Sequence, residues 1–126
     1  MPLTIQFDAA RRRIESAADG PVTHAEIVAH LDRERADGVL GLPEFVDATR
    51  ATAVFSADEV RRLLERLRTL RRNGEIGPAA VLVADDLSYG MLRMLEILTD
   101  GVCDVRPFRD RAAAESWLAS KAGSPV

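Results

Sequence analysis

The stretch Gly77-Pro78-Ala79-Ala80-Val81-Leu82-Val83-Ala84-Asp85-Asp86 decides the fold class of this chain. Six apolar residues run without interruption over 79–84, between a Gly-Pro pair and two aspartates. A run this short, bounded by turn residues and containing β-branched side chains, predicts a strand that is buried on both faces. Such strands are typical of sheets that are covered by helices, so we expect an α/β fold.

Upstream of this strand, two alternating segments predict a hairpin. Leu3, Ile5 and Phe7 alternate with polar residues, and a second alternation follows over 13–18 after a short polar break. This pattern favours an antiparallel pair at the edge of the sheet. The turn residues over 19–21, Asp-Gly-Pro, are expected to end it.

Two helix starts are marked by capping boxes, Thr-x-x-Glu over 23–26 and Ser-x-x-Glu over 56–59. They predict one helix over about 24–36 and a second that begins at 57 and ends at Asn73-Gly74. The second helix carries one continuous apolar stripe and should pack on the sheet. The stripe consists of Val60, Leu63, Leu64, Leu67 and Leu70.

Four more elements complete the predicted order. A β-prone segment over 45–49 predicts a second central strand, and 102–105 predicts the last one. The third helix follows Asp86, and its apolar stripe is Met91, Met94, Leu95 and Leu98. The final helix is capped by Asp110 and carries Ala113, Trp117 and Leu118. The order β-β-α-β-α-β-α-β-α implies a mixed, mostly parallel sheet, because helices separate the later strands.

Composition predicts a single globular domain over 1–121, followed by a flexible tail over 122–126. A net charge of −3 argues against a dedicated nucleic-acid binder, which usually carries a basic excess. The sequence contains no apolar run of the ~20 residues that a membrane-spanning helix needs, and its first residues lack the pattern of a signal peptide. We therefore expect a cytoplasmic protein that neither inserts into a membrane nor binds nucleic acid.

The sequence offers little for catalysis. Cys103 is the single cysteine, so we expect it to be a small buried hydrophobe in a strand rather than a nucleophile or zinc ligand. His24 and His30 have no nucleophile nearby in the sequence and are expected at the surface. Glycine-rich phosphate loops and the hydrolase Gly-x-Ser-x-Gly pattern are absent. We expect no enzymatic activity, cofactor or metal.

The acidic pair Asp85-Asp86 has two interpretations. It follows the central strand at its carboxyl end, where ligands bind in open α/β sheets. The pair can hold a cation or serve in acid–base chemistry with a metal. In the simpler interpretation, the two carboxylates solvate the strand end and cap the next helix.

The element order resembles that of the SpoIIAA-like, or STAS/SEC14, domains. The segment Ala84-Asp85-Asp86-Leu87 with Tyr89-Gly90-Met91-Leu92-Arg93-Met94 is similar to the region after the buried strand in bacterial members. The segment over 105–118, from Val-Arg-Pro-Phe-Arg-Asp to Trp-Leu, is similar to their closing pattern. The resemblance covers most of the chain and implies a SpoIIAA-like fold.

The resemblance also implies a position for a regulatory serine. In the anti-sigma-factor antagonists of this group, a serine that is phosphorylated begins the helix after a central strand, and Ser56 occupies the matching position here. Those proteins resemble Asp-Ser-Ser-Gly at this point, whereas this chain reads Phe55-Ser56-Ala57-Asp58. A helix N-cap is the alternative role for Ser56.

The leading functional hypothesis is a non-enzymatic regulatory or protein-binding module that contacts a protein partner or a second copy of itself. Arginines along the second helix offer a surface for an anionic partner, although the glutamates between them also suit a solvated face. These arginines include Arg61, Arg62, Arg68 and Arg72.

The alternative hypothesis is a domain that binds a small apolar ligand or lipid, as the SEC14 side of the resemblance implies. The third helix would then form the lid of a pocket beside its start near Ser88. We expect this pocket to be lined by Leu87, Tyr89, Met91 and Met94.

Overall fold

A computed structural model describes residues 3–53, 55–74 and 76–122, and these contain nine elements in the predicted order. In chain order they are β1 (Leu3–Asp8), β2 (Arg13–Val22), α1 (His24–Ala36), β3 (Glu44–Ala53), α2 (Ala57–Arg72), β4 (Ala79–Leu82), α3 (Asp86–Leu98), β5 (Val105–Phe108) and α4 (Arg111–Ala122). Most of the predicted tail, residues 123–126, lies outside the described residues. Within the described ranges, no helix has the length and apolar character that crossing a bilayer requires.

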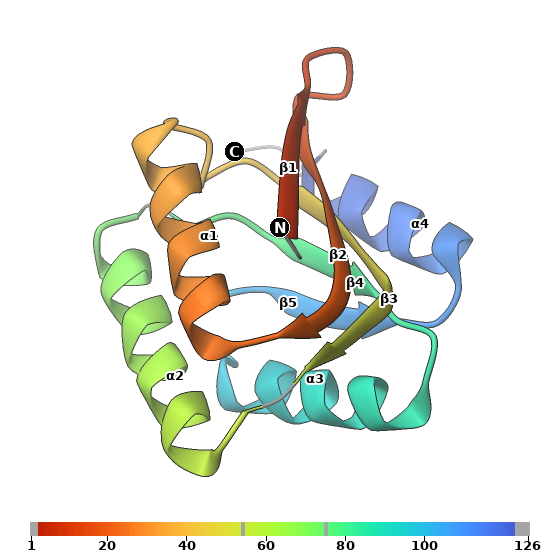
Figure 1. Ribbon diagram of the computed structural model, residues 1–126. Helices are drawn as coiled ribbons and strands as arrows, with labels where there is room; N and C mark the ends of the chain where they lie inside the picture. The colour runs from red at the N-terminus through yellow and green to blue at the C-terminus, as the bar shows by residue number, and fades with distance from the viewer. Residues whose placement is uncertain (1–2, 54, 75, 123–126) are drawn as a thin grey trace.

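The five strands form one sheet in the order β1-β2-β3-β4-β5 (Figure 1). β1 and β2 pair antiparallel, and this confirms the predicted hairpin at the sheet edge. The pairs β2–β3, β3–β4 and β4–β5 are all parallel. The α/β fold class and the mixed, mostly parallel sheet are therefore as predicted.

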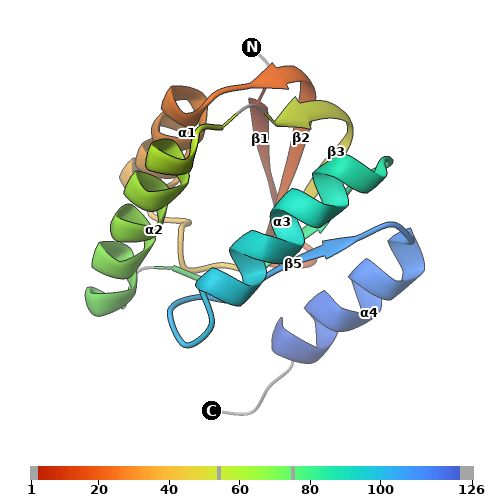
Figure 2. The same cartoon turned by 90° about the horizontal axis from the view of Figure 1, so that it is seen from below.

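Helices lie on both faces of the sheet, and the two faces differ in how tightly they pack. Figure 2 shows α4 on one side of β5 and α3 on the other, with α1 and α2 beside the sheet on the α3 side. The face toward α4 holds the main buried cluster, which consists of Phe45, Ala80, Leu82, Ala114 and Leu118. Phe108 and Trp117 pack against this cluster, with their ring centroids 5.7 Å apart.

Both predicted capping boxes are confirmed. The Ser56 hydroxyl accepts a hydrogen bond from the Glu59 backbone N–H at 3.1 Å, and the Ser56 N–H donates to the Glu59 carboxylate at 2.8 Å. Thr23 and Glu26 make the same reciprocal pair at the start of α1. The leucines of the predicted α2 stripe are buried, and burial of each contributes on the order of 1.5–3 kcal/mol before entropy. They are Leu63, Leu64, Leu67 and Leu70.

The predicted end of the hairpin is wrong. β2 does not stop at Asp19-Gly20-Pro21 but continues through them to Val22, paired with the second half of β3. The register shifts between Ala17 and Asp19, and Gly20, which follows the shift, has a φ of 76°, a conformation that glycine adopts readily. β3 is correspondingly longer than the predicted 45–49.

The last strand begins later than predicted. Residues 102 and 103 belong to a turn in which the backbone N–H groups of Val102 and Cys103 both donate to the Thr99 carbonyl. These hydrogen bonds close the end of α3 and engage the N–H groups of Val102 and Cys103. The Asp104 carbonyl accepts from the Ala79 N–H of β4 at 2.8 Å, and β5 itself starts at Val105.

The apolar stripe predicted for α3 faces the sheet only in part, through Leu95. Met94 and Leu98 are exposed, whereas Ser88, Leu92, Leu95 and Thr99 lie on the inward face or are buried. The helix is apolar on more than one side, so hydrophobic periodicity alone does not indicate which side is inward.

A buried arginine joins β2 to α4. Arg13, on β2, is only 8% exposed and donates to both carboxylate oxygens of Glu115 at 2.8 and 2.9 Å. Its Nε also donates to Glu15 at 2.7 Å, and its guanidinium lies 5.3 Å from the centre of the Phe45 ring. A planar guanidinium suits this bidentate contact far better than a lysine would.

Replacement of Gly77 by alanine is expected to destabilise the fold. An added Cβ would stand 2.5 Å from the Gly41 carbonyl oxygen and 2.7 Å from that of Leu42, and both are backbone atoms. We expect Gly77→Ala to lower the free energy of unfolding by about 1–3 kcal/mol, as overpacking does. Urea unfolding followed by circular dichroism measures it.

Gly90→Ala is the matched control, because no atom lies within 4 Å of the Cβ that it adds to α3. It should stabilise the protein by roughly 0.5–1 kcal/mol, since glycine is costly inside a helix. Equal effects of the two substitutions would contradict the close approach at Gly77.

Glu115→Gln is expected to remove stability in a pH-dependent way. Hydrogen bonds from Arg13 are the main reason that the pKa of Glu115 lies below its usual range. Its contribution to stability is therefore complete above the unfolded carboxyl pKa of about 4.3 and lost as the pH falls through the lowered folded value. Because Glu115 is partly exposed, we expect a loss on the order of 1 kcal/mol at pH 7.

Thermal unfolding of both proteins at pH 7 and at acidic pH measures this difference, which should shrink below about pH 4.3. Glu65→Gln is the control, because Glu65 pairs with Arg68 only on the exposed surface of α2. If the difference in stability between wild type and Glu115→Gln is the same at both pH values, the charge of Glu115 does not contribute to the stability of the fold.

Candidate functional site

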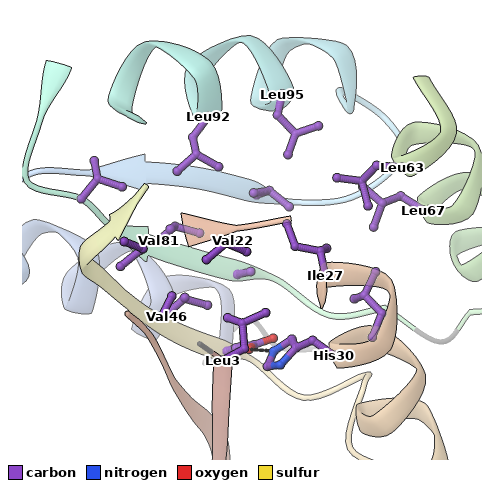
Figure 3. Close-up of a pocket in the computed structure, with 18 of the residues that line it drawn as sticks. Leu3, Val22, Ile27, His30, Val46, Leu63, Leu67, Val81, Leu92 and Leu95 are labelled. Atoms are coloured by element: carbon purple, nitrogen blue, oxygen red, sulfur yellow. Dashed lines mark hydrogen bonds and ion pairs between the residues drawn. The ribbon is translucent and has the colours of Figure 1, made fainter. Parts of the chain in front are cut away.

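An apolar cavity of about 190 Å³ lies between the sheet and the helices α1, α2 and α3 (Figure 3). Side chains from all three helices point into it toward the strands. The helices contribute Ile27, His30 and Leu31 from α1, Leu63 and Leu67 from α2, and Ser88, Leu92 and Leu95 from α3. The strands contribute Leu3, Ala18, Val22, Val46, Ala48, Ala79, Val81 and Val105, among others.

Small side chains on the sheet explain why this face is not filled. Ala18, Ala48 and Ala79 all line the cavity from three different strands, opposite leucines of the helices. Lining side chains such as Val46, Val81 and Leu92 are only half-buried, so the cavity is partly open to solvent. A ligand that fills it would remove their apolar surface from water.

One end of the cavity is polar. His30 and Glu44 both line it, and His30 Nε2 lies 2.9 Å from Glu44 Oε2. The same nitrogen lies 3.4 Å from Glu34 Oε1, one helical turn further along α1. The Ser16 hydroxyl donates to Glu44 Oε2 at 2.5 Å. The three side chains of His30, Glu34 and Glu44 are 10%, 0% and 12% exposed, so this polar cluster is almost sealed from solvent.

The two carboxyl groups in this cluster differ in their electrostatics. Burial, followed by repulsion from Glu44, raises the pKa of Glu34 to about 10. Burial acts on Glu44 in the same direction, but hydrogen bonds with His30 and from Ser16 outweigh it and hold the pKa of Glu44 below its usual range. Two carboxyls that share a site commonly separate in this way, one keeping its proton and the other ionised.

The four residues predicted to line a pocket beside α3 do not line this cavity. Leu87 and Met94 are 76% and 56% exposed, and Met91 is half-buried without lining the cavity. Tyr89 lies in a shallow hollow on the outer surface, near the guanidinium of Arg109. α3 closes the cavity instead through Ser88, Leu92 and Leu95.

The serine and arginines singled out from the sequence lie on α2, away from the cavity lining. Ser56 is exposed and serves as the N-cap. Arg61 pairs with Asp58 at 3.2 Å, Arg68 with Glu65 at 3.0 Å, and Arg72 donates to Thr69. Arg62 lies beside Asp58 and Glu65 in a shallow surface hollow.

Asp85 and Asp86, the acidic pair after β4, make the contacts that are expected if the pair caps the next helix. Asp85 is the N-cap of α3 and accepts from the Ser88 N–H at 2.7 Å. This backbone hydrogen bond is the main reason that the pKa of Asp85 is lowered. Asp86 forms an ion pair with Arg109.

Sequence reasoning missed the polar cluster, and the surface position expected for His30 is wrong. The local signal was His30-x-x-x-Glu34, which places both side chains on one face of a helix. The third member, Glu44, joins them only through the packing of α1 beside β3.

The other two residues weighed for catalysis are also partly enclosed. His24 is half-buried, and its buried Nε2 has no hydrogen-bond partner within the described part of the chain. Cys103 is half-buried in the turn after α3 rather than in a strand, and burial raises the pKa of its thiol.

Comparison with known proteins identifies the fold. No protein-family model and no curated protein matches the chain. Among solved structures, the chain is similar to an uncharacterised protein of the DUF3478 family from Shewanella loihica PV-4, which has a SpoIIAA-like fold. The two are 18% identical, with a TM-score of 0.59 over 92% of this chain and 91% of the other. With the order and pairing of its strands, this match shows that the chain is a domain with a SpoIIAA-like fold.

Proposed function

We propose that this domain is a binding module, rather than an enzyme, and that its ligand is a small apolar molecule held in the cavity between the sheet and α1–α3. The observation that carries the proposal is the cavity itself, which is lined almost entirely by aliphatic side chains. Concave, apolar sites with a few polar groups are the usual form of small-molecule sites.

The size of the cavity limits the ligand. An engineered apolar cavity of about 150 Å³ stays dry and takes up benzene or xenon. The present cavity, at about 190 Å³, suits a compact ligand of benzene size or slightly larger, or one end of a longer apolar chain. His30 and Glu44 at one end would orient a ligand that carries a single polar group.

Binding of n-butylbenzene is the first test of this proposal. Titration into protein with ¹³C-labelled methyl groups should shift the Leu92, Leu95 and Val81 resonances saturably, because these side chains line the cavity. Val81→Phe should weaken binding at least tenfold, since the added ring occupies the void.

Leu87→Phe is the matched control, because it adds the same ring to an exposed position on α3. It should bind as wild type does. The proposal fails if the methyl resonances do not shift at ligand saturation, or if Val81→Phe binds as tightly as wild type.

A second candidate function, contact with a protein partner or a second copy of the chain, is favoured by the outer face of α3. Its exposed apolar side chains form what we call the α3 ridge, namely Leu87, Met94, Ile97 and Leu98. Exposed apolar side chains that gather on one helix are typical of interaction surfaces. Arginines on α2 form ion pairs with acidic residues of the same helix. Their charge is partly balanced there, so this face is a weaker candidate for binding an anionic partner than the α3 ridge is for binding an apolar one.

Light scattering at micromolar to millimolar concentration tests self-association through the α3 ridge. We expect the wild type to exceed monomer mass and Ile97→Lys, which charges a side chain that is 62% exposed, to remain monomeric. Arg61→Ala on α2 is the control and should behave as wild type does. A wild type of monomer mass at every concentration would contradict self-association.

A further inference from the structure

The polar end of the cavity contains three metal-ligating groups at coordination spacing. One ligand atom each from His30, Glu34 and Glu44 can be chosen so that all three lie within 4.8 Å of one another. His30 and Glu34 are four residues apart and so share one face of α1, as metal-binding helix pairs do. Glu44, the first residue of β3, faces them from the sheet.

Glu34 is the member of the cluster that its protein environment leaves unsatisfied. Its side chain is completely buried, and neither of its carboxyl oxygens has a hydrogen-bond partner among the residues that the structure describes. A buried polar atom without a partner costs free energy. His30 Nε2 lies 3.4 Å from Glu34 Oε1 without forming a hydrogen bond to it. A cation between the three groups would satisfy these oxygens.

The spacing of the donors fits a transition-metal ion. Bonds of about 2.0–2.2 Å to nitrogen and carboxylate oxygen place two ligands of one ion roughly 3–4 Å apart. His30 Nε2 lies 2.9 Å from Glu44 Oε2 and 3.4 Å from Glu34 Oε1, so only small side-chain movements are needed to close on an ion.

The surroundings of the cluster also resemble those of metal sites. The Ser16 hydroxyl donates to Glu44, and a second hydrogen-bonded layer of this kind orients ligating carboxylates. His30 and Glu44 border the cavity, so the side of the ion that faces the cavity stays open to water or to a donor atom of a ligand.

We propose that His30, Glu34 and Glu44 form a binding site for a divalent transition-metal ion such as Zn²⁺ or Mn²⁺. One imidazole nitrogen and two carboxylate oxygens supply the ligands, a donor set that suits both ions. Two ionised carboxylates balance the charge of the ion. This site does not depend on the apolar ligand, because the metal alone is the probe.

Metal titration of the chelator-treated full chain tests the site. Isothermal titration with Zn²⁺, and electron paramagnetic resonance with Mn²⁺, should show one ion per chain. Glu34→Gln should weaken binding at least thirtyfold. It keeps the size of the side chain and removes its charge, and circular dichroism checks that the variant is folded. Glu65→Gln is the control, because Glu65 lies on the exposed surface of α2, and it should bind as wild type does.

X-ray absorption of the zinc-loaded wild type makes the test independent of any variant. The expected spectrum shows a single imidazole and oxygen ligands without sulfur. A sulfur ligand, which would place zinc at Cys103, or a second imidazole would overturn the proposal. The proposal would also be overturned if no metal binds at millimolar concentration, or if Glu34→Gln binds metal as tightly as wild type does. Glu34 and Glu44 would then be a carboxyl pair that shares a proton.

Discussion

The structure depends on the unequal packing of the two faces of its sheet. Toward α4, Phe45, Ala80 and Leu82 meet Ala114 and Leu118 in a cluster with almost no exposed surface. Arg13 and Glu115 join the same helix to β2 through a buried bidentate contact. On the other face, α1, α2 and α3 bury leucines such as Leu63 and Leu67 but leave an apolar cavity of about 190 Å³ beside the sheet.

Much of this fold could be predicted from local sequence signals. The apolar run over 79–84 indicated a buried strand, and the two capping boxes marked the starts of α1 and α2. The extension of β2 through Asp19-Gly20-Pro21 could not be predicted in this way. These residues favour a turn locally, and pairing with β3 after a register shift overrides that preference.

The candidate site was less predictable, because long-range packing decides it. The hypothetical pocket beside α3 included Leu87 and Met94, which are exposed, whereas Leu92, together with Leu95 of the predicted stripe, lines the cavity. A helix with apolar residues on more than one side does not show which side the sheet covers. The cluster of His30, Glu34 and Glu44 is a comparable case, since only the tertiary fold brings the start of β3 to α1.

The cavity between the sheet and α1–α3 links fold to function. Its apolar lining is partly exposed to solvent, and a ligand that fills the cavity would remove this surface from water. The most direct test of this account is a crystal structure of the protein under xenon pressure. Xenon binds in dry apolar cavities, so we predict xenon density between Val81, Leu92 and Leu95. A structure in which side chains fill this space, or in which the space takes up no xenon, would contradict the account.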